Sequence, residues 1–299
     1  MLKYSYLRFC LNCAELRAWF PEAVFRGALG YTLIKKYCLQ KNHEKNCRIC
    51  PFNKHCINAL FFHPEPAAES IIKTSTPPMP FSLFARNVSG QWFLFFILIG
   101  PAMEYSAELI DAICEMGREG VSRTKIKFSV LNIMDMHTGI ELFNQNTSII
   151  KKPACGEFNL SLLKGNSAAD LQIITLSPWR IQIQSKLTRS WQFEDLVKKL
   201  LLRYSLLLST YSGMNYEYSE FLEMAGQVIL VNNNLRLVSR RRFSSTQQSI
   251  IDMDGMIGKM TFHGPVRDFE KLLEFGALFG IGKNTAFGCG RFEYRFSDK

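Results

Sequence analysis

The sequence predicts an α+β protein with two tandem ferredoxin-like (RRM-like) domains, each with the element order βαββαβ. The chain has 299 residues, enough for two domains of ordinary size. Strand-like and helix-like patterns of apolar residues follow one another in the same order in both halves, and a polar segment, residues 142–167, separates the halves. We therefore predict an N-terminal domain over residues 1–160 with a cysteine-rich insertion. A C-terminal domain with a glycine-rich loop is predicted over residues 168–299.

The first half begins with an alternating stretch in which Tyr4, Tyr6 and Arg8 would share one face of a strand. Prolines punctuate the chain between residues 64 and 80 and disfavour regular structure there. The expected elements, in order, are strand 3–13, helix 23–39, strands 81–88 and 91–99 that turn at Ser89-Gly90, helix 104–118, and strand 125–136.

The second half repeats this order. The predicted helix 193–210 has leucines at helical spacing. In the predicted helix 266–275, acidic residues lie between apolar residues, which also fits one buried and one exposed helix face. The expected elements are strand 171–183, helix 193–210, strands 227–237 and 255–262, helix 266–275, and strand 286–296. The two halves share no visible sequence repeat, so the tandem architecture rests on element order.

The chain is basic, since 36 Lys and Arg residues outnumber 26 Asp and Glu residues, for a formal net charge of +10. This excess favours a polyanionic partner, nucleic acid before an anionic membrane surface; solubility alone is the alternative. The strongest apolar run, residues 92–100, is about half the length needed to span a bilayer and predicts a buried strand. Because the N-terminus has no signal-peptide pattern, we expect a cytoplasmic protein without a membrane partner.

Five glycines lie close together near the C-terminus: Gly276, Gly280, Gly282, Gly288 and Gly290. With Lys283 and Arg291 among them, such a loop can place amide N–H groups and cations along a phosphate chain. The segment is no Walker loop, because Asn284 follows Lys283 and Ala277 replaces the first glycine. It is also a poor dinucleotide motif, because it follows a helix and precedes a strand. A helix C-cap explains one glycine but not five, so we predict a phosphate-contacting loop.

The segment GIGKNTAFGCGRF, residues 280–292, resembles the terminal signature of the RAMP superfamily, and in particular of the CRISPR-associated family that processes precursor crRNA. Other segments resemble this family in the same order: AVFRGALGY (23–31), CRICPFNKHCINALF (47–61), LSPWR (176–180), a helix with Leu196, Arg203 and Leu207, and Ser239-Arg240-Arg241 followed by GMIGKMTFHG (255–264). The resemblance implies tandem ferredoxin-like domains, which agrees with the element order.

The basic run Arg240, Arg241 and Arg242 is the second predicted RNA contact. Adjacent strand residues face opposite sides, so one or two of the three would reach phosphates. The predicted RNA-binding set joins this run to the loop: Arg240, Arg241, Arg242, Gly280, Gly282, Lys283, Gly288, Gly290 and Arg291.

Four of the nine cysteines, Cys38, Cys47, Cys50 and Cys56, form a cluster with the spacing C-x8-C-x2-C-x5-C. In a cytosolic chain this spacing favours a metal site over disulfides, and four thiolates can hold a structural zinc ion. An iron–sulfur cluster and separate buried thiols are the alternatives. His55 is a possible replacement ligand, and no metal is needed for the chemistry considered next.

RNA can be cut without metal when its own 2′-OH attacks the adjacent phosphate, leaving 2′,3′-cyclic phosphate and 5′-OH ends. The resemblance implies this reaction, with a histidine base around or after the first helix and a tyrosine or lysine nearby. His43 ranks first for the base because it follows that helix; His55 and His263 rank lower. Tyr31 and Lys35, four residues apart, could supply the acid and the cation, and a solvated helix face is the alternative.

Three functions follow from these features. The first is an endoribonuclease that processes CRISPR repeat RNA. The second is a non-catalytic RAMP subunit that binds crRNA in an effector complex with other CRISPR proteins. The third, a zinc-stapled protein that binds other proteins, would show no salt-dependent affinity for RNA.

Overall fold

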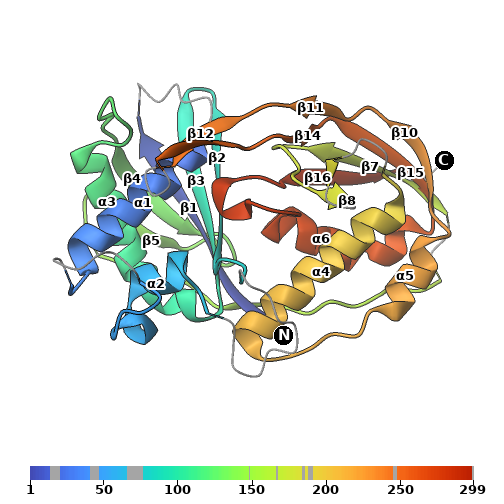
Figure 1. The fold of residues 1–299 in the computed structure, drawn as a ribbon, viewed down its shortest axis with the longest axis horizontal. Coiled ribbons are helices and arrows are strands. Elements are labelled where there is room, and N and C mark those ends of the chain that lie inside the picture. The colour runs from blue at the N-terminus through green and yellow to red at the C-terminus, as the bar shows by residue number, and fades with distance from the viewer. Residues whose placement is uncertain are drawn as a thin grey trace. The chain divides into compact units, whose positions relative to one another are not determined.

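The chain folds into two compact units, each described by itself. In the computed structural model, unit 1 comprises Met1–Phe158 and Leu207–Met214, and unit 2 comprises Asn159–Leu206 and Asn215–Lys299 (Figure 1). The structure describes residues 1–13, 21–40, 47–65, 77–147, 149–165, 168–183, 186–187, 191–244 and 248–297.

Unit 1 is built on an antiparallel sheet with the strand order β2-β3-β1-β4-β5, in which β6 also pairs with β1. Strands β1 to β4 thus have the 2-3-1-4 order of a ferredoxin-like domain. Its elements are β1 (Leu2–Asn12), α1 (Pro21–Tyr37), η1 (Asn53–His55), α2 (Ile57–Phe62), β2 (Phe81–Val88), β3 (Gln91–Ile99), η2 (Gly100–Tyr105), α3 (Ser106–Glu119), β4 (Ser129–Asp135), β5 (Glu141–Asn144) and β6 (Gly156–Phe158).

The core of unit 1 follows from alternation in its strands. Leu7, Phe9 and Leu11 of β1 are buried, and α1 buries Leu29 and Leu33 at helical spacing. The β2–β3 hairpin has the predicted bounds because Ser89 and Gly90 adopt the positive φ angles of a tight turn.

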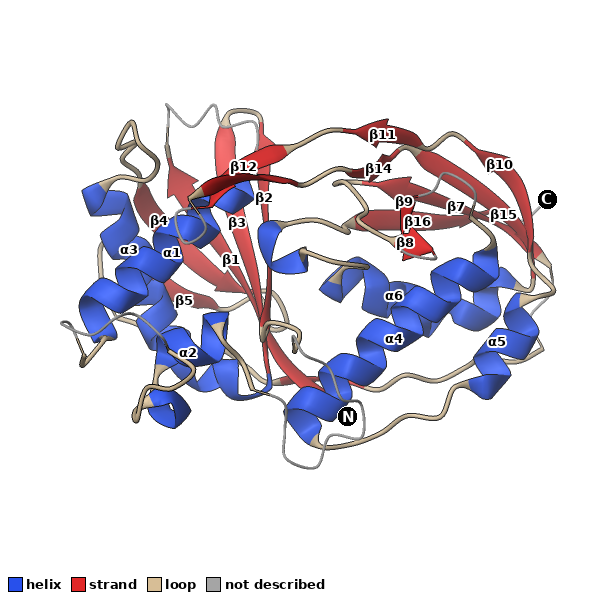
Figure 2. Ribbon diagram, in the orientation of Figure 1, coloured by secondary structure: helices blue, strands red, loops and turns tan. Residues whose placement is uncertain are grey.

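Unit 2 repeats the plan with the sheet order β10-β15-β7-β16, again 2-3-1-4. Figure 2 shows α4 and α6 beside this sheet. Its elements are β7 (Ala169–Thr175), β8 (Gln182–Ile183), β9 (Lys186–Leu187), α4 (Phe193–Ser212), α5 (Ser219–Ala225), β10 (Ile229–Asn233), β11 (Arg236–Val238), β12 (Arg241–Ser244), β13 (Ser249–Asp252), β14 (Gly255–Ile257), β15 (Lys259–Gly264), η3 (Val266–Phe269), α6 (Glu270–Phe279), η4 (Thr285–Phe287) and β16 (Phe292–Ser297).

Aromatic side chains join the helices of unit 2 to its sheet. The ring of Phe193 on α4 lies 5.2 Å from that of Phe262 on β15 and 4.9 Å from that of Phe269 on η3. Such edge-to-face pairs add to the burial of apolar area. The α+β class and the tandem ferredoxin-like architecture predicted from element order are confirmed.

A long hairpin extends from the sheet of unit 2. The pairs β10–β15, β11–β14 and β12–β13 follow one another along this hairpin (Figure 2). After a shift between Leu230 and Asn232, one register continues from Asn232 opposite Thr261 to Ser244 opposite Ser249. The predicted strand 227–237 is therefore two strands. Arg240, Arg241 and Arg242 lie on the outer part of this hairpin.

Several predicted elements differ from the structure for local physical reasons. The segment 142–167 predicted as a link contributes β6, whose three residues pair with β1, and most of β5. Strand 125–136 begins only at Ser129, because Lys125 has a φ of 52° in a turn. Strand 286–296 begins at Phe292, because residues 285–287 form a 3-10 helix and Gly288 and Gly290 have positive φ angles.

Candidate nucleic-acid interface

The glycine-rich loop connects α6 to β16 and requires its glycines. Gly280, Gly282, Gly288 and Gly290 have φ angles between 76° and 81°, in the region that side chains with a Cβ rarely adopt. At Gly290 a Cβ would lie 1.9 Å from the carbonyl oxygen of Ile281, so any other residue must displace backbone. The glycines therefore make a compact turn in which two passes of the backbone touch.

Most amide groups of this loop are already used inside the protein. The N–H of Ile281 donates to the carbonyl of Gly290 at 2.9 Å, and the N–H of Gly290 donates to the carbonyl of Pro178 at 3.0 Å. The amides of Gly280, Lys283, Phe287, Gly288 and Cys289 also donate to backbone carbonyls. The sequence suggested that these amides would bind phosphate. They do not line a phosphate site, because they already donate to backbone carbonyls of the protein. The groups that this loop leaves for a ligand are therefore its side chains rather than these amides.

The two cations of the loop lie in different environments. Lys283 is exposed, and its Nζ donates to Oε1 of Gln182 at 2.9 Å. Arg291 is only 9% exposed, and its guanidinium donates to the carbonyl of Leu278. The backbone carbonyl of Arg291 in turn accepts from the indole N–H of Trp179 at 3.2 Å. Arg291 thus holds the end of α6 within the fold, whereas Lys283 is presented to solvent.

A second buried arginine, Arg203 on α4, forms hydrogen bonds that hold the loop in place. Its Nη2 donates to the carbonyl of Phe279 at 2.9 Å and to Oγ1 of Thr285 at 2.7 Å, and its Nε also reaches Phe279. It therefore bonds to both the last residue of α6 and η4 at the centre of the loop. The sequence signal for this role is an arginine in the apolar stripe of an amphipathic helix, to which we assigned no function.

The hairpin arginines are held in three ways. Arg241 is exposed and pairs with Asp252 across the hairpin, with 3.1 Å between Nε and Oδ1. The guanidinium of Arg242 lies 4.3 Å from the centre of the Phe287 ring in the glycine loop, and burial lowers its pKa. The backbone of Arg240 bonds to Asp254. The cation–π contact is the observation that brings the basic run and the glycine loop together.

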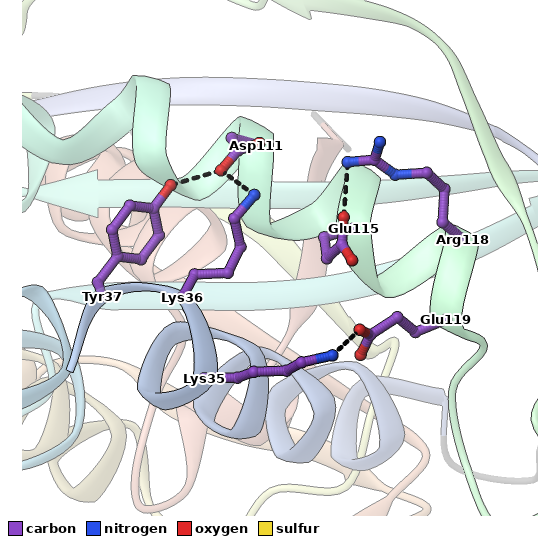
Figure 3. A network of polar contacts seen from close by, with 7 residues as sticks. All are labelled: Lys35, Lys36, Tyr37, Asp111, Glu115, Arg118 and Glu119. Atoms are coloured by element: carbon purple, nitrogen blue, oxygen red, sulfur yellow. Dashed lines mark hydrogen bonds and ion pairs between the residues drawn. The ribbon is translucent and has the colours of Figure 1, made fainter. Parts of the chain in front are cut away.

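In unit 1, the predicted catalytic residues Tyr31 and Lys35 lie on α1. Tyr31 is 64% exposed. Lys35 forms an ion pair with Glu119 of α3, and this hydrogen bond raises the pKa of Lys35 (Figure 3). Lys36 and Tyr37 both bond to Asp111 at 2.5 Å. The basic end of α1 is thus matched by carboxylates of α3, and Lys35 reaches a phosphate only by leaving Glu119.

The histidines differ sharply in their surroundings. His43, ranked first from the sequence, lies outside the described residues. His55 is exposed in η1, and His137 packs edge-on against the ring of Tyr4 at 4.6 Å. His263 pairs with Asp170 across two strands, with 2.6 Å from Nδ1 to Oδ1. His63, to which the sequence assigned no function, lines a cavity in unit 1.

The four clustered cysteines lie near one another without forming a metal site as placed. Sγ of Cys38 and Sγ of Cys50 both donate to Gln40, at 3.5 and 3.6 Å, and Asn58 donates to Sγ of Cys47 at 3.3 Å. Burial raises the pKa of Cys47, and the other three thiols raise it further. Among the residues that the structure describes, no three His, Cys, Asp or Glu side chains are arranged to hold a metal ion. The zinc site stays a prediction.

The C-terminal region, which carries the glycine loop and the basic hairpin, decides the family. Residues 173–292 match the family model described as CRISPR-associated endoribonuclease Cas6. Residues 173–292 therefore form a Cas6-family domain. Residues 2–155 match a second model, AF_1859_N, described as an N-terminal domain. No protein of curated function matches the sequence. The predicted RAMP-type family is therefore confirmed, and with it a place in CRISPR RNA processing.

Solved structures support the fold over the whole chain. A Cas6 (TTHB231) product complex is 12% identical, with a TM-score of 0.54 over 98% of this chain and 99% of that chain. A Cas6 (TTHA0078) product complex is 14% identical, with a TM-score of 0.51 over 98% and 99%. A partial Cas6-RT-Cas1–Cas2 complex is 13% identical, with a TM-score of 0.57 over 99% of this chain and 46% of that chain.

Across the described residues, no helix combines the length and the apolarity needed to cross a bilayer.

Proposed function

We propose that this Cas6-family protein is the endoribonuclease that cuts CRISPR repeat RNA within precursor crRNA, by metal-independent attack of the 2′-OH. The observation that carries the proposal is the contact between the basic hairpin and the glycine loop, where Arg242 lies 4.3 Å from the Phe287 ring. Arg241 and Lys283 are exposed in the same unit. A rigid basic surface of this kind suits a phosphate backbone, because fixed cations lose little conformational freedom on binding.

In this proposal the RNA is held mainly by cations of unit 2. Lys283 and Arg241 would contact phosphates directly, and Arg240 and Arg242 would complete the strip along the hairpin. The four positive-φ glycines shape the loop that presents Lys283. Such contacts position the RNA, whereas base edges specify its sequence. Affinity for RNA should therefore fall steeply with salt.

The cutting chemistry would come from unit 1. A base takes the proton of the 2′-OH, O2′ attacks the phosphorus, the P–O5′ bond breaks, and O5′ takes a proton. The ends would be a 2′,3′-cyclic phosphate and a 5′-OH. His43 is the base ranked first from the sequence, Tyr31 would donate the proton, and Lys35 would stabilise the developing charge once it leaves Glu119. No cofactor takes part in these steps.

One observation favours a second candidate, a non-catalytic subunit that binds crRNA beside other CRISPR proteins. Lys35, the proposed cation, is neutralised by Glu119. In addition, one neighbour in structure is a Cas6-RT-Cas1–Cas2 complex, so Cas6 chains do occur in larger assemblies. Tight binding of repeat RNA by the purified protein, with no cleavage, would favour this candidate.

We further propose that Cys38, Cys47, Cys50 and Cys56 hold one structural zinc ion when it is supplied. Bonds from Cys38 and Cys50 to the same residue, Gln40, support this by bringing two of the thiols together. Protein purified with zinc present should contain about one zinc per chain by mass spectrometry of the metal. The double variant Cys47→Ser/Cys50→Ser should contain none. Equal zinc in both proteins would contradict the site.

The cutting reaction is tested by incubating the protein with its repeat RNA in EDTA and identifying the product ends. We expect one cut per repeat, a 2′,3′-cyclic phosphate on the upstream fragment and a 5′-OH on the downstream fragment. Products with 5′-phosphate ends, or cleavage that stops in EDTA, would contradict the proposed chemistry.

A further inference from the structure

Unit 1 contains a polar cavity that neither the predicted site nor the basic hairpin includes. It has a volume of about 200 Å³ and is lined by Asn53, Lys54, Ala59, Leu60, His63, Pro64, Glu65, Pro101, Thr210 and Tyr211. A dry cavity of about 150 Å³ admits a benzene-sized ring, so this one has room for a single ribose or pyrimidine ring. Lys54 and Glu65 at its edge are exposed, so the cavity is reachable from solvent.

The charges around the cavity are mainly positive. Arg26 of α1, Arg48 of the cysteine-rich segment and Lys54 of η1 face His63 or the cavity, against one carboxylate, Glu65. Asn53 donates to that carboxylate at 3.0 Å and to the backbone carbonyl of Arg48 at 3.2 Å. Three cations and one engaged carboxylate favour an anionic group such as a phosphate at the cavity mouth.

His63 is fixed at the end of α2. Its backbone N–H donates to the carbonyl of Ala59 at 2.8 Å, and the side chain is half-buried. On the opposite wall, the hydroxyl of Tyr211 donates to the carbonyl of Pro78. A general base must be held in place, be reachable by substrate and stay neutral near physiological pH. The backbone of His63 is held by its bond to Ala59, and its side chain lines the cavity, where a substrate can reach it.

The lowered pKa of His63 meets the third condition, that the base stays neutral near physiological pH. Burial lowers the pKa of His63, and the charges of Arg48 and Arg26 lower it further. A histidine with a lowered pKa is neutral over more of the physiological range, so its ring nitrogen is available to take a proton.

We infer that the His63 cavity receives the nucleotide on the 5′ side of the cut, and that His63 is the base that deprotonates its 2′-OH. The inference rests on the proposed function and gives the roles of His43, Tyr31 and Lys35 to His63, water and Lys54. The His63 ring takes the 2′-OH proton, the O2′–P bond forms and the P–O5′ bond breaks. Water protonates the leaving O5′, and His63 later returns its proton to solvent. Lys54 neutralises charge on the phosphate.

The test is single-turnover cleavage of repeat RNA by His63→Ala, with His43→Ala and wild type in parallel. We expect His63→Ala to be slowed about 100-fold or more. It should still bind repeat RNA with a 2′-deoxy cut site as wild type does. Added imidazole should restore part of its rate, which a merely structural histidine would not allow. Lys54→Ala should slow cleavage about 10-fold, while Lys152→Ala, an exposed lysine of the same unit, should not.

The pH profile adds a second readout. Because a base must be neutral, the rate should rise with pH through the pKa of His63, with a midpoint below the ordinary histidine value of 6.5. The charged and titratable groups that face His63 or line its cavity are Arg26, Arg48, Lys54, Glu65 and Tyr211. A midpoint above 6.5 would contradict the assignment.

Two results would overturn the inference while leaving the proposed function standing. One is cleavage by His63→Ala within about threefold of wild type. The other is a slow His63→Ala variant that imidazole does not rescue and that has also lost RNA binding. Absence of cleavage by wild type would instead contradict the proposed function. If His63→Ala does not fold, Lys54→Ala and the pH midpoint of wild type carry the test.

Discussion

The two ferredoxin-like units share one strand order but place their charged residues differently. In unit 2, Arg203 and Arg291 are buried and donate to the backbone around the glycine loop. In unit 1, Lys35 and Lys36 lie on the surface and pair with Glu119 and Asp111. Buried arginines that donate to backbone carbonyls fix a loop, whereas surface pairs contribute little and exchange easily. The same scaffold thus carries a rigid loop in one copy and an adaptable face in the other.

The largest effect is expected from a substitution that distorts the backbone of the rigid loop. Gly290→Ala places a Cβ 1.9 Å from the Ile281 carbonyl oxygen at a φ of 81°, and should destabilise unit 2 by at least about 3 kcal/mol. Urea unfolding followed by tryptophan fluorescence measures this change, because Trp179 and Trp191 are buried in that unit. The control is Gly27→Ala in α1, where a Cβ meets nothing within 4 Å. It should stabilise the helix by up to about 1 kcal/mol. Equal effects of the two would contradict the comparison.

The second-largest effect is expected from the loss of Arg203, whose side chain donates hydrogen bonds to the loop. Arg203→Met should cost about 2–3 kcal/mol in the free energy of unfolding, because the Phe279 carbonyl and Thr285 hydroxyl lose a charged donor in a buried site. Lys198→Met on the same helix removes an exposed pair with Glu194 and should cost less than about 0.5 kcal/mol. If Lys198→Met proves the costlier change, Arg203 does not hold the loop.

A smaller effect concerns RNA binding alone. Lys283→Ala should weaken binding of repeat RNA about 3–10-fold at moderate salt and reduce the salt slope by about one, without changing stability. Fluorescence anisotropy at several salt concentrations measures both quantities. Lys152→Ala serves as the matched control in unit 1. An unchanged slope for Lys283→Ala would remove this lysine from the interface.

The smallest effect is expected from loss of the ion pair between Lys35 and Glu119 in unit 1. Glu119→Gln removes the partner of Lys35, so the pKa of Lys35 should fall toward its ordinary value. Stability should hardly change, since the pair is at the surface. NMR titration of the lysine side chain follows the first change and urea unfolding the second. A loss above about 2 kcal/mol would show that the α1–α3 pair is structural.

Local patterns predicted the regular elements well. The β2–β3 hairpin has the predicted bounds because an apolar run, residues 92–100, follows a Ser-Gly turn with positive φ angles. The position of the glycine loop was also visible, since four glycines between a helix and a strand demand an unusual backbone. The family followed from the residues of this loop and the hairpin before it.

Features set by distant partners could not be predicted. Strand β6 has three residues and forms only because β1 offers an edge more than a hundred residues away. The loop amides were expected to face phosphate, but their partners include Pro178 and Arg180, which no local pattern reveals. The burial of Arg291 and the polar cavity around His63 likewise depend on which segments pack together.

The central claim is that this Cas6-family protein cuts RNA by using the RNA's own 2′-OH. The most direct measurement is single-turnover cleavage, in EDTA, of a repeat RNA with one 2′-deoxy nucleotide on the 5′ side of the cut, beside the unmodified RNA. We predict that the modified RNA binds equally well and is not cut there, since the nucleophile is missing. Cleavage at the same position and rate would contradict the account.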